Sequence, residues 1–211
     1  MNGWEIIRHA VAIYGRVIDS QTNKGIGGAR VRISDGPPEF MDTLPYQARS
    51  YGRRWESLRD RRDRKHAEPD GHFHFLDLPD GSYTLTALDP GSGSRYGTAQ
   101  VIIAVTLDSL GDPIPTNADI SLPPTTITGQ VTDQSNGDPV FMAQLHVKGS
   151  NETTYCDNQG DYRLVGLETG SREIQVTAQG YHSGFETVVL NAAGTVVTRD
   201  ITLIRSIALP L

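Results

Sequence analysis

The chain has 211 residues, of which 37% are apolar, and a formal net charge of −6. These values suit one large or two small soluble domains and exclude a largely disordered chain. Twenty-two glycines and twelve prolines are spread along the sequence, which indicates many turns between short strands and predicts an all-β protein.

Residues 1–12 are interpreted as an N-terminal extension. Glu5, Arg8 and His9 interrupt any apolar stretch there, and no small-residue cleavage site is present, so the segment is a poor secretory signal. No apolar run in the sequence approaches the length that spans a membrane. We therefore expect a cytoplasmic protein without membrane insertion.

Two copies of one pattern follow. Residues 13–33, "IYGRVIDSQTNKGIGGARVRI", match residues 127–147 without a gap, and "DGHFHFLDLPDGSYTLTALDPG" matches "QGDYRLVGLETGSREIQVTAQG". Such an internal repeat indicates two structural units of the same kind. The matched pairs include Gly15 with Gly129, Asp19 with Asp133, Ala29 with Ala143, Gly71 with Gly160, Phe73 with Tyr162 and Leu85 with Ile174.

The repeat predicts the domain boundaries. The first domain spans 13–123 and the second spans 124–205, with an apolar tail at 206–211. "PPTT" at 123–126 joins them and predicts a fairly fixed angle between the domains. Strands about every ten residues, alternating in polarity and bounded by Gly, Asp, Asn and Pro, predict an antiparallel sandwich of about seven strands in each copy.

These repeated stretches resemble the carboxypeptidase regulatory-like domain, a transthyretin-like sandwich. The resemblance covers most of the chain outside the first dozen residues, residues 34–69 and the tail. It implies two tandem antiparallel seven-stranded Greek-key sandwiches that serve stability, display or interaction and carry no catalytic residues or cofactor. The opening "NGWEIIRHAVAIYGRV" also resembles bacterial double-module proteins associated with contractile, phage-tail-like injection particles, which implies a component of the cap, tail or baseplate region.

His72 and His74 stand two residues apart beside carboxylates, a pattern that many metal sites share. The second copy has other residue types at the matching positions, whereas the intervening Phe73 matches Tyr162. We therefore expect both histidines on the outward face of a strand. A metal-dependent enzyme that uses them is the remote alternative. The single cysteine, Cys156, is interpreted as a small strand or turn residue rather than a catalytic thiol.

An insertion at about 38–68 lengthens the first copy by about 25 residues. Its segment 43–66 is the only helix-like pattern in the chain, with a candidate cap at Asp42 or Thr43. Gly52 interrupts this pattern. Apolar residues at three- and four-residue steps predict one stripe along the helix, formed by Ala48, Tyr51, Trp55 and Leu58.

The same insertion is basic. Residues 49–65 carry eight of the nineteen basic residues and a local charge of +5, which leaves −11 for the rest of the chain. One interpretation packs the stripe on its own sandwich with the arginines in solvent. The other is an arm that docks on a protein partner, because aromatic residues and arginine are enriched at interfaces. The residues expected to bind this partner are Tyr51, Arg53, Arg54, Trp55, Leu58, Arg61 and Arg62.

These observations favour a non-catalytic structural module that docks into a larger protein assembly. If that assembly is an injection particle, we expect it to form in the cytoplasm. Nucleic acid is not expected as a partner, because the acidic body would repel it. The alternative is a carbohydrate- or surface-binding sandwich, whose candidate loop aromatics are Tyr96, Tyr181 and Phe185.

Overall fold

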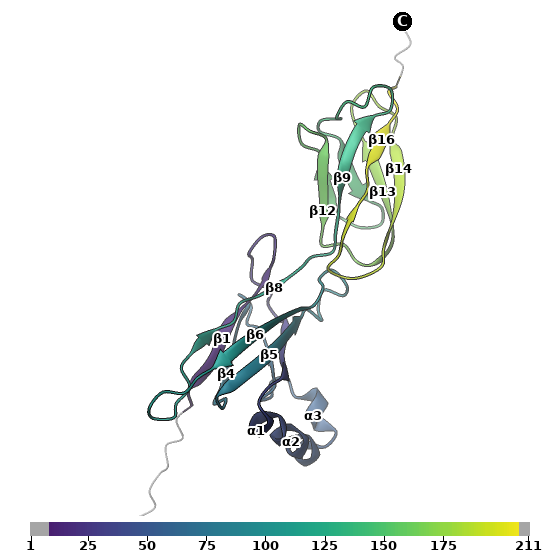
Figure 1. Ribbon diagram of the computed structural model, residues 1–211. Helices are drawn as coiled ribbons and strands as arrows, with labels where there is room; N and C mark the ends of the chain where they lie inside the picture. Colours follow the sequence, from purple (N-terminus) through teal and green to yellow (C-terminus); the bar gives the residue numbers. More distant parts are fainter. Residues whose placement is uncertain (1–8, 207–211) are drawn as a thin grey trace, which may run out of the picture. The chain divides into compact units, whose positions relative to one another are not determined.

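The structure is a computed structural model that describes residues 9–206 (Figure 1). The chain forms two compact units, each a β-sandwich. The first comprises the described residues up to Gly91 together with Thr98–Leu122, and the second comprises Ser92–Gly97 and the described residues from Pro123 onward. The predicted all-β fold, with two tandem sandwiches and a helical insertion in the first, is confirmed.

Two sheets form the first unit. In one sheet, β1 pairs antiparallel with β4 and parallel with both β7 and β8. The other sheet has the order β3-β2-β5-β6. Because β7 and β8 are two pieces of one closing strand along β1, eight strands stand where about seven are predicted. The strands are β1 (Val11–Asp19), β2 (Arg30–Asp35), β3 (Arg64–His66), β4 (His72–Leu76), β5 (Gly81–Leu88), β6 (Ala99–Val105), β7 (Thr116–Asn117) and β8 (Ile120–Leu122).

The second unit repeats the first strand by strand. β9 pairs antiparallel with β12 and parallel with β15 and β16, and the other sheet has the order β11-β10-β13-β14. Tyr162 lies opposite Gly129 as Phe73 lies opposite Gly15, so matched residues hold matched positions. The strands are β9 (Thr126–Asp133), β10 (Gln144–Val147), β11 (Thr153–Tyr155), β12 (Asp161–Val165), β13 (Gly170–Thr177), β14 (Gly184–Leu190), β15 (Val196–Thr198) and β16 (Ile201–Leu203).

One glycine in each copy lets the closing strand approach the strand that it pairs with. A Cβ on Gly15 would lie 2.4 Å from the carbonyl oxygen of Ala118, and one on Gly129 would lie 2.0 Å from that of Arg199. Both distances are too short for any real side chain. The repeat of this glycine in the sequence therefore has a packing cause.

An aspartate marks the break in each closing strand. The side chain of Asp119 accepts a hydrogen bond from the Arg16 N–H (2.8 Å), and Asp200 accepts one from the Gln130 N–H (3.0 Å). Each carboxylate thus satisfies a backbone donor of the long first strand where the ladder is interrupted.

The insertion forms three short helices, α1 (Pro38–Met41), α2 (Thr43–Tyr51) and α3 (Arg54–Ser57). The single helical pattern predicted over 43–66 is therefore wrong in extent. Gly52 separates α2 from α3 with φ of 55° and ψ of −133°, a conformation that ends a helix and favours glycine. Arg64–His66 pair with β2 as a strand, because sheet pairing overrides their helical spacing. Asp42 precedes α2 as predicted, without a side-chain capping bond.

The segment Ser92–Gly97, which follows β5 in the chain, belongs to the second unit. The Arg95 guanidinium donates to the Gly166 carbonyl (2.9 Å) and forms an ion pair with Glu152. Ser94 accepts hydrogen bonds from the Thr125 hydroxyl and the Thr169 N–H. Sequence comparison assigns these residues to 13–123, whereas their contacts complete the second sandwich.

Met142 occupies in the second copy the position of Gly28 in the first. The Gly28 N–H donates to Ala67 and the Met142 N–H to Cys156, and both residues have a positive φ, 79° and 56°. Methionine is strained in this region where glycine is not. Because Met142 is 53% exposed, its side chain gains little packing to offset the strain.

We expect Met142→Gly to raise the free energy of unfolding of the second unit by about 1 kcal/mol, measured by urea denaturation. Phe141→Gly is the matched control, because Phe141 is also an exposed apolar residue but does not have a positive φ. This variant should show no gain in the free energy of unfolding. A Met142→Gly protein that is no more stable than the parent would show that Met142 makes compensating contacts.

Candidate functional site: the basic insertion of the first sandwich

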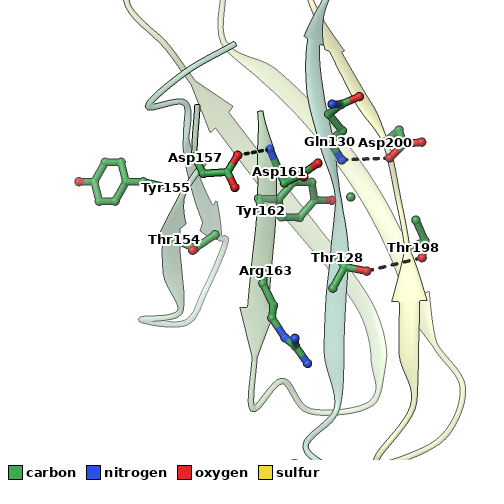
Figure 2. Close-up of a pocket in the computed structure, with 11 residues that line it drawn as sticks. Thr128, Gln130, Thr154, Tyr155, Asp157, Asp161, Tyr162, Arg163, Thr198 and Asp200 are labelled. Carbon is green, nitrogen blue, oxygen red and sulfur yellow. Dashed lines mark hydrogen bonds between the residues drawn. The ribbon is translucent and has the colours of Figure 1, made fainter. Parts of the chain in front are cut away.

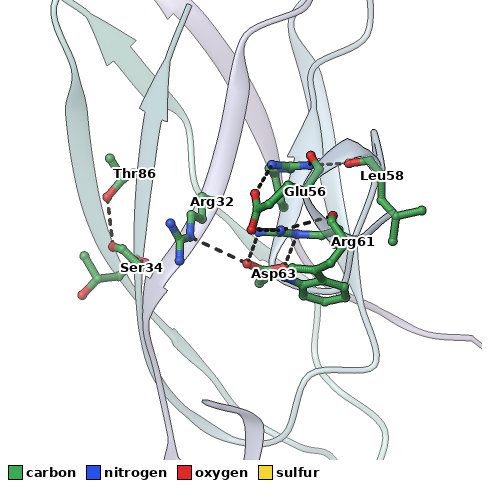
Figure 3. A network of polar contacts seen from close by, with 10 residues as sticks. Arg32, Ser34, Glu56, Leu58, Arg61, Asp63 and Thr86 are labelled. Carbon is green, nitrogen blue, oxygen red and sulfur yellow. Dashed lines mark hydrogen bonds and ion pairs between the residues drawn. The ribbon is translucent and has the colours of Figure 1, made fainter. Parts of the chain in front are cut away.

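A buried ion pair holds the insertion on the first sandwich (Figure 3). The Arg61 guanidinium donates two hydrogen bonds to the Asp63 carboxylate, at 2.9 and 2.8 Å, and the two side chains are only 3% and 2% exposed. The same guanidinium lies 4.4 Å from the centre of the Trp55 ring. The Ile33 N–H donates to the carbonyl of Asp63 (2.8 Å), which ties this cluster to β2.

An aromatic contact provides a second anchor, at α1. Phe40 is 1% exposed and meets the Tyr83 ring edge to face at 5.7 Å. The Arg62 guanidinium lies 5.6 Å from the Phe40 ring and donates to the carbonyl of Asp77. Burial raises the pKa of Tyr83 to about 12, so its hydroxyl stays neutral and donates to the Pro79 carbonyl.

The residues expected to bind a partner divide into three groups. Four are exposed, one is half-buried and two are buried beneath them. Sequence periodicity did not identify Tyr46, 75% exposed, or the exposed Arg49, because neither lies on the apolar stripe. The exposed four are Tyr51, Arg53, Arg54 and Arg62, the half-buried residue is Leu58, and the buried two are Trp55 and Arg61.

We call the outer surface of α2 and the start of α3 the basic face; it consists of Tyr46, Arg49, Tyr51, Arg53 and Arg54. All five side chains are exposed. The Tyr51 ring lies 5.9 Å from the buried Trp55 ring, so the face is connected to the anchored cluster. This arrangement presents aromatic and cationic groups on a segment that is held in place from below.

His72 and His74 lie on the outward face of β4, as expected. Both are exposed, whereas Phe73 between them is 3% exposed. The His72 ring nitrogen lies 2.8 Å from the carboxylate of Asp70, an ordinary exposed pair. Within residues 9–206, no group of three or more His, Cys, Asp or Glu side chains is arranged to hold a metal ion.

Cys156 is also placed as interpreted. It is 2% exposed and lies just after β11, where its backbone bonds to Ala143. Burial raises the pKa of its thiol to about 11, so the reactive thiolate is scarce at neutral pH.

The second sandwich carries an open groove of about 640 Å³ beside β9 and β12 (Figure 2). Its lining is polar, with three aspartates, Arg163 and the exposed ring of Tyr155. Two of the aspartates have structural roles, since Asp157 accepts backbone bonds within its own turn and Asp200 accepts one from Gln130. The groove offers hydrogen-bonding groups and two tyrosine rings, of which Tyr155 is exposed and Tyr162 is buried.

The loop aromatics proposed for sugar binding lie in the second unit. The Tyr181 hydroxyl donates to Asp133 (3.0 Å) and its ring lies beneath the Arg205 guanidinium at 5.9 Å, so Tyr181 has a structural role. Tyr96 pairs through its backbone with Pro124. Phe185 is expected in a loop but lies on the strand β14, where it is 58% exposed.

A family model described as the carboxypeptidase regulatory-like domain matches residues 126–204. The resemblance inferred from the sequence is thus supported directly for the second copy. No curated protein matches the chain. No helix within residues 9–206 is long and apolar enough to cross a membrane.

Solved structures with a similar course of the chain include two pilins and a third protein. The shaft pilin SpaA from Lactobacillus rhamnosus GG is 12% identical with a TM-score of 0.46, over 96% of this chain and 99% of the pilin. The minor pilin GBS52 of Streptococcus agalactiae is 14% identical with a TM-score of 0.34, over 94% and 98%. The Bacillus anthracis TIE protein is 11% identical with a TM-score of 0.38. The match spans 93% of this chain but only 34% of that protein.

We expect Trp55→Ala to lower the free energy of unfolding of the first unit by about 3–5 kcal/mol, because it removes a buried ring and leaves a cavity under α3. Circular dichroism during urea denaturation measures the change. Tyr46→Ala, at an exposed position, should stay within about 0.5 kcal/mol of the parent. Equal stability of the Trp55→Ala and Tyr46→Ala proteins would contradict the anchoring role of Trp55.

Hydrogen bonds from Ser135 and Arg205 hold the pKa of Asp133 well below its usual range. In the unfolded chain this carboxyl has the ordinary aspartate pKa of about 3.9. Its stabilising contribution is therefore complete above that pH and is lost as the pH falls through the lower folded-state pKa. We expect Asp133→Asn to reduce stability at pH 7 and to weaken the loss of stability on acidification.

Urea denaturation at pH 7 and at pH 3 measures both effects. Asp138→Asn, an exposed aspartate of the same loop, should keep the acid dependence of the parent. An Asp133→Asn protein whose stability falls with acid as steeply as that of the parent would contradict the assignment.

Proposed function

We propose that this protein is a non-catalytic structural module that docks, through its basic face, on an acidic surface of a protein partner in a larger assembly. The observation that carries the proposal is the presence of two exposed tyrosines beside three exposed arginines on one short segment. Tyrosine and arginine are, with tryptophan, the residue types enriched among the residues that dominate binding at protein interfaces.

The anchoring beneath the basic face supports this role. A segment fixed by Trp55 and by the Arg61–Asp63 pair loses little conformational entropy when a partner binds, so more of the contact energy appears as affinity. The local charge of +5 against an acidic remainder favours an acidic partner surface, which would also speed association at low salt.

The larger assembly that we propose is a contractile, phage-tail-like injection particle assembled in the cytoplasm. The support is the resemblance of the opening and of "DGHFHFLDLPDGSYTLTA" to double-module proteins of such particles. Two small sandwiches suit a building block of a particle, where shape and contacts matter more than chemistry.

The test compares partners that co-purify from the native cell with the full chain and its variants, identified by mass spectrometry. Tyr51→Ala with Arg53→Ala and Arg54→Ala should lose a specific partner while the thermal midpoint stays unchanged. A control with Lys24→Ala and Arg163→Ala, which removes two exposed charges elsewhere, should retain that partner. Components of a contractile particle among the specific partners would support the finer proposal.

Two outcomes would contradict the proposal. In one, the basic-face variant retains every partner that the parent binds. In the other, the chain binds a polysaccharide and loses it on Tyr155→Ala, which would favour the carbohydrate-binding alternative and move the site to the groove of the second sandwich.

A further inference from the structure

Besides the groove of the second sandwich, a cavity lies in the first unit, between α3 and the outward side of strands β2 and β5. It holds about 380 Å³, near the lower end of the roughly 300–1,000 Å³ that small-molecule sites occupy. Four of its eight lining residues are arginines, of which Figure 3 labels Arg32 and Arg61. The lining residues are Arg30, Arg32, Ser34, Glu56, Arg61, Arg64, Thr86 and Leu88.

The backbone brings the four arginines together. Arg30 and Arg32 alternate with the buried Val31 on β2 and therefore share its outward side. Arg64 lies opposite Arg32 in the register with β3. A tight turn then places Arg61 next to Arg64, with the Arg61 N–H donating to the Arg64 carbonyl (2.8 Å).

The carboxylates in reach do not balance this charge. Asp63 is committed to Arg61 and lies 3.7 Å from Arg32. Glu56 lies 3.4 Å from Arg61 and 3.7 Å from Arg64, and its side chain is 80% exposed. Four arginines against two carboxylates leave two positive charges in excess around the cavity.

Arg64 is the group whose bonding is incomplete. Its side chain is 9% exposed, and its Nε has no hydrogen-bond partner among residues 9–206. Its Nη2 donates to the carbonyls of Glu56 and Leu58. Burial lowers the pKa of Arg64, and the nearby positive charge of Arg61 lowers it further. A buried charged donor without a partner is costly unless an anion completes it.

We propose that this cavity is a binding site for a small oxyanion of the phosphate class, free or as the phosphate group of a small molecule. Guanidinium forks match the oxygens of a phosphate and bind them with paired hydrogen bonds. The two excess positive charges suit a dianion. Glu56 reaches over the arginines from α3 at long range, so it occupies the site weakly and competes with the ligand.

Isothermal titration calorimetry of the full chain with inorganic phosphate and with pyrophosphate tests the proposal. We expect one site per chain. Removal of the competing carboxylate in Glu56→Gln should tighten binding by roughly fivefold, as expected for a nearby exposed charge. Arg30→Gln with Arg32→Gln should weaken binding by at least about tenfold, with far-UV circular dichroism to verify the fold.

The matched control is Lys24→Gln with Arg163→Gln, which removes the same charge from exposed positions that do not line the cavity. It should leave binding within about twofold, since exposed charges outside the site are screened. An equal loss in both double variants would show non-specific attraction and overturn the site. No binding to the parent and to Glu56→Gln would overturn it as well. Citrate binding more tightly than pyrophosphate would overturn the phosphate class. The Glu56→Gln arm remains decisive if the Arg30 and Arg32 variant does not fold.

Discussion

The buried pair of Arg61 and Asp63 is the interaction on which the insertion of the first sandwich depends. Two opposite charges can be removed from water together only when each satisfies the other with good geometry, and their paired hydrogen bonds meet this condition. Asp63 also bonds to β2 through its carbonyl, and Arg61 covers Trp55. This ion pair therefore fixes α3 and the cavity beside it, and together with the contact between Phe40 of α1 and Tyr83 it holds the basic face in place.

Much of the fold is predictable from the sequence because the chain contains its own comparison. A position such as Gly15 recurs as Gly129 since the closing strand leaves no room for a side chain in either copy. Phe73 and Tyr162 recur because both fill the core. Comparison of the copies also separates His72 and His74 from the core positions, which places them on the outside.

The insertion has no counterpart in the second copy, and there prediction fails in part. Helical spacing continues through Arg64–His66, yet these residues gain more from pairing with β2. A run of arginines is typically a solvated surface, whereas Arg61 and Arg64 are buried because Asp63 and backbone carbonyls receive them. Such partners come from the tertiary fold, so neither the depth of each arginine nor the exposure of Tyr46 follows from periodicity.

The segment Ser92–Gly97 has a consequence for the evolution of the chain. Ser94 and Arg95 complete the second sandwich through Thr125, Thr169 and Glu152, yet they are encoded within the first repeat. Recombination at "PPTT" would separate the second repeat from groups that its own residues bond. The two halves share one sequence pattern, but they are not interchangeable cassettes. The second sandwich can be moved intact only together with this hexapeptide, which precedes "PPTT" in the chain.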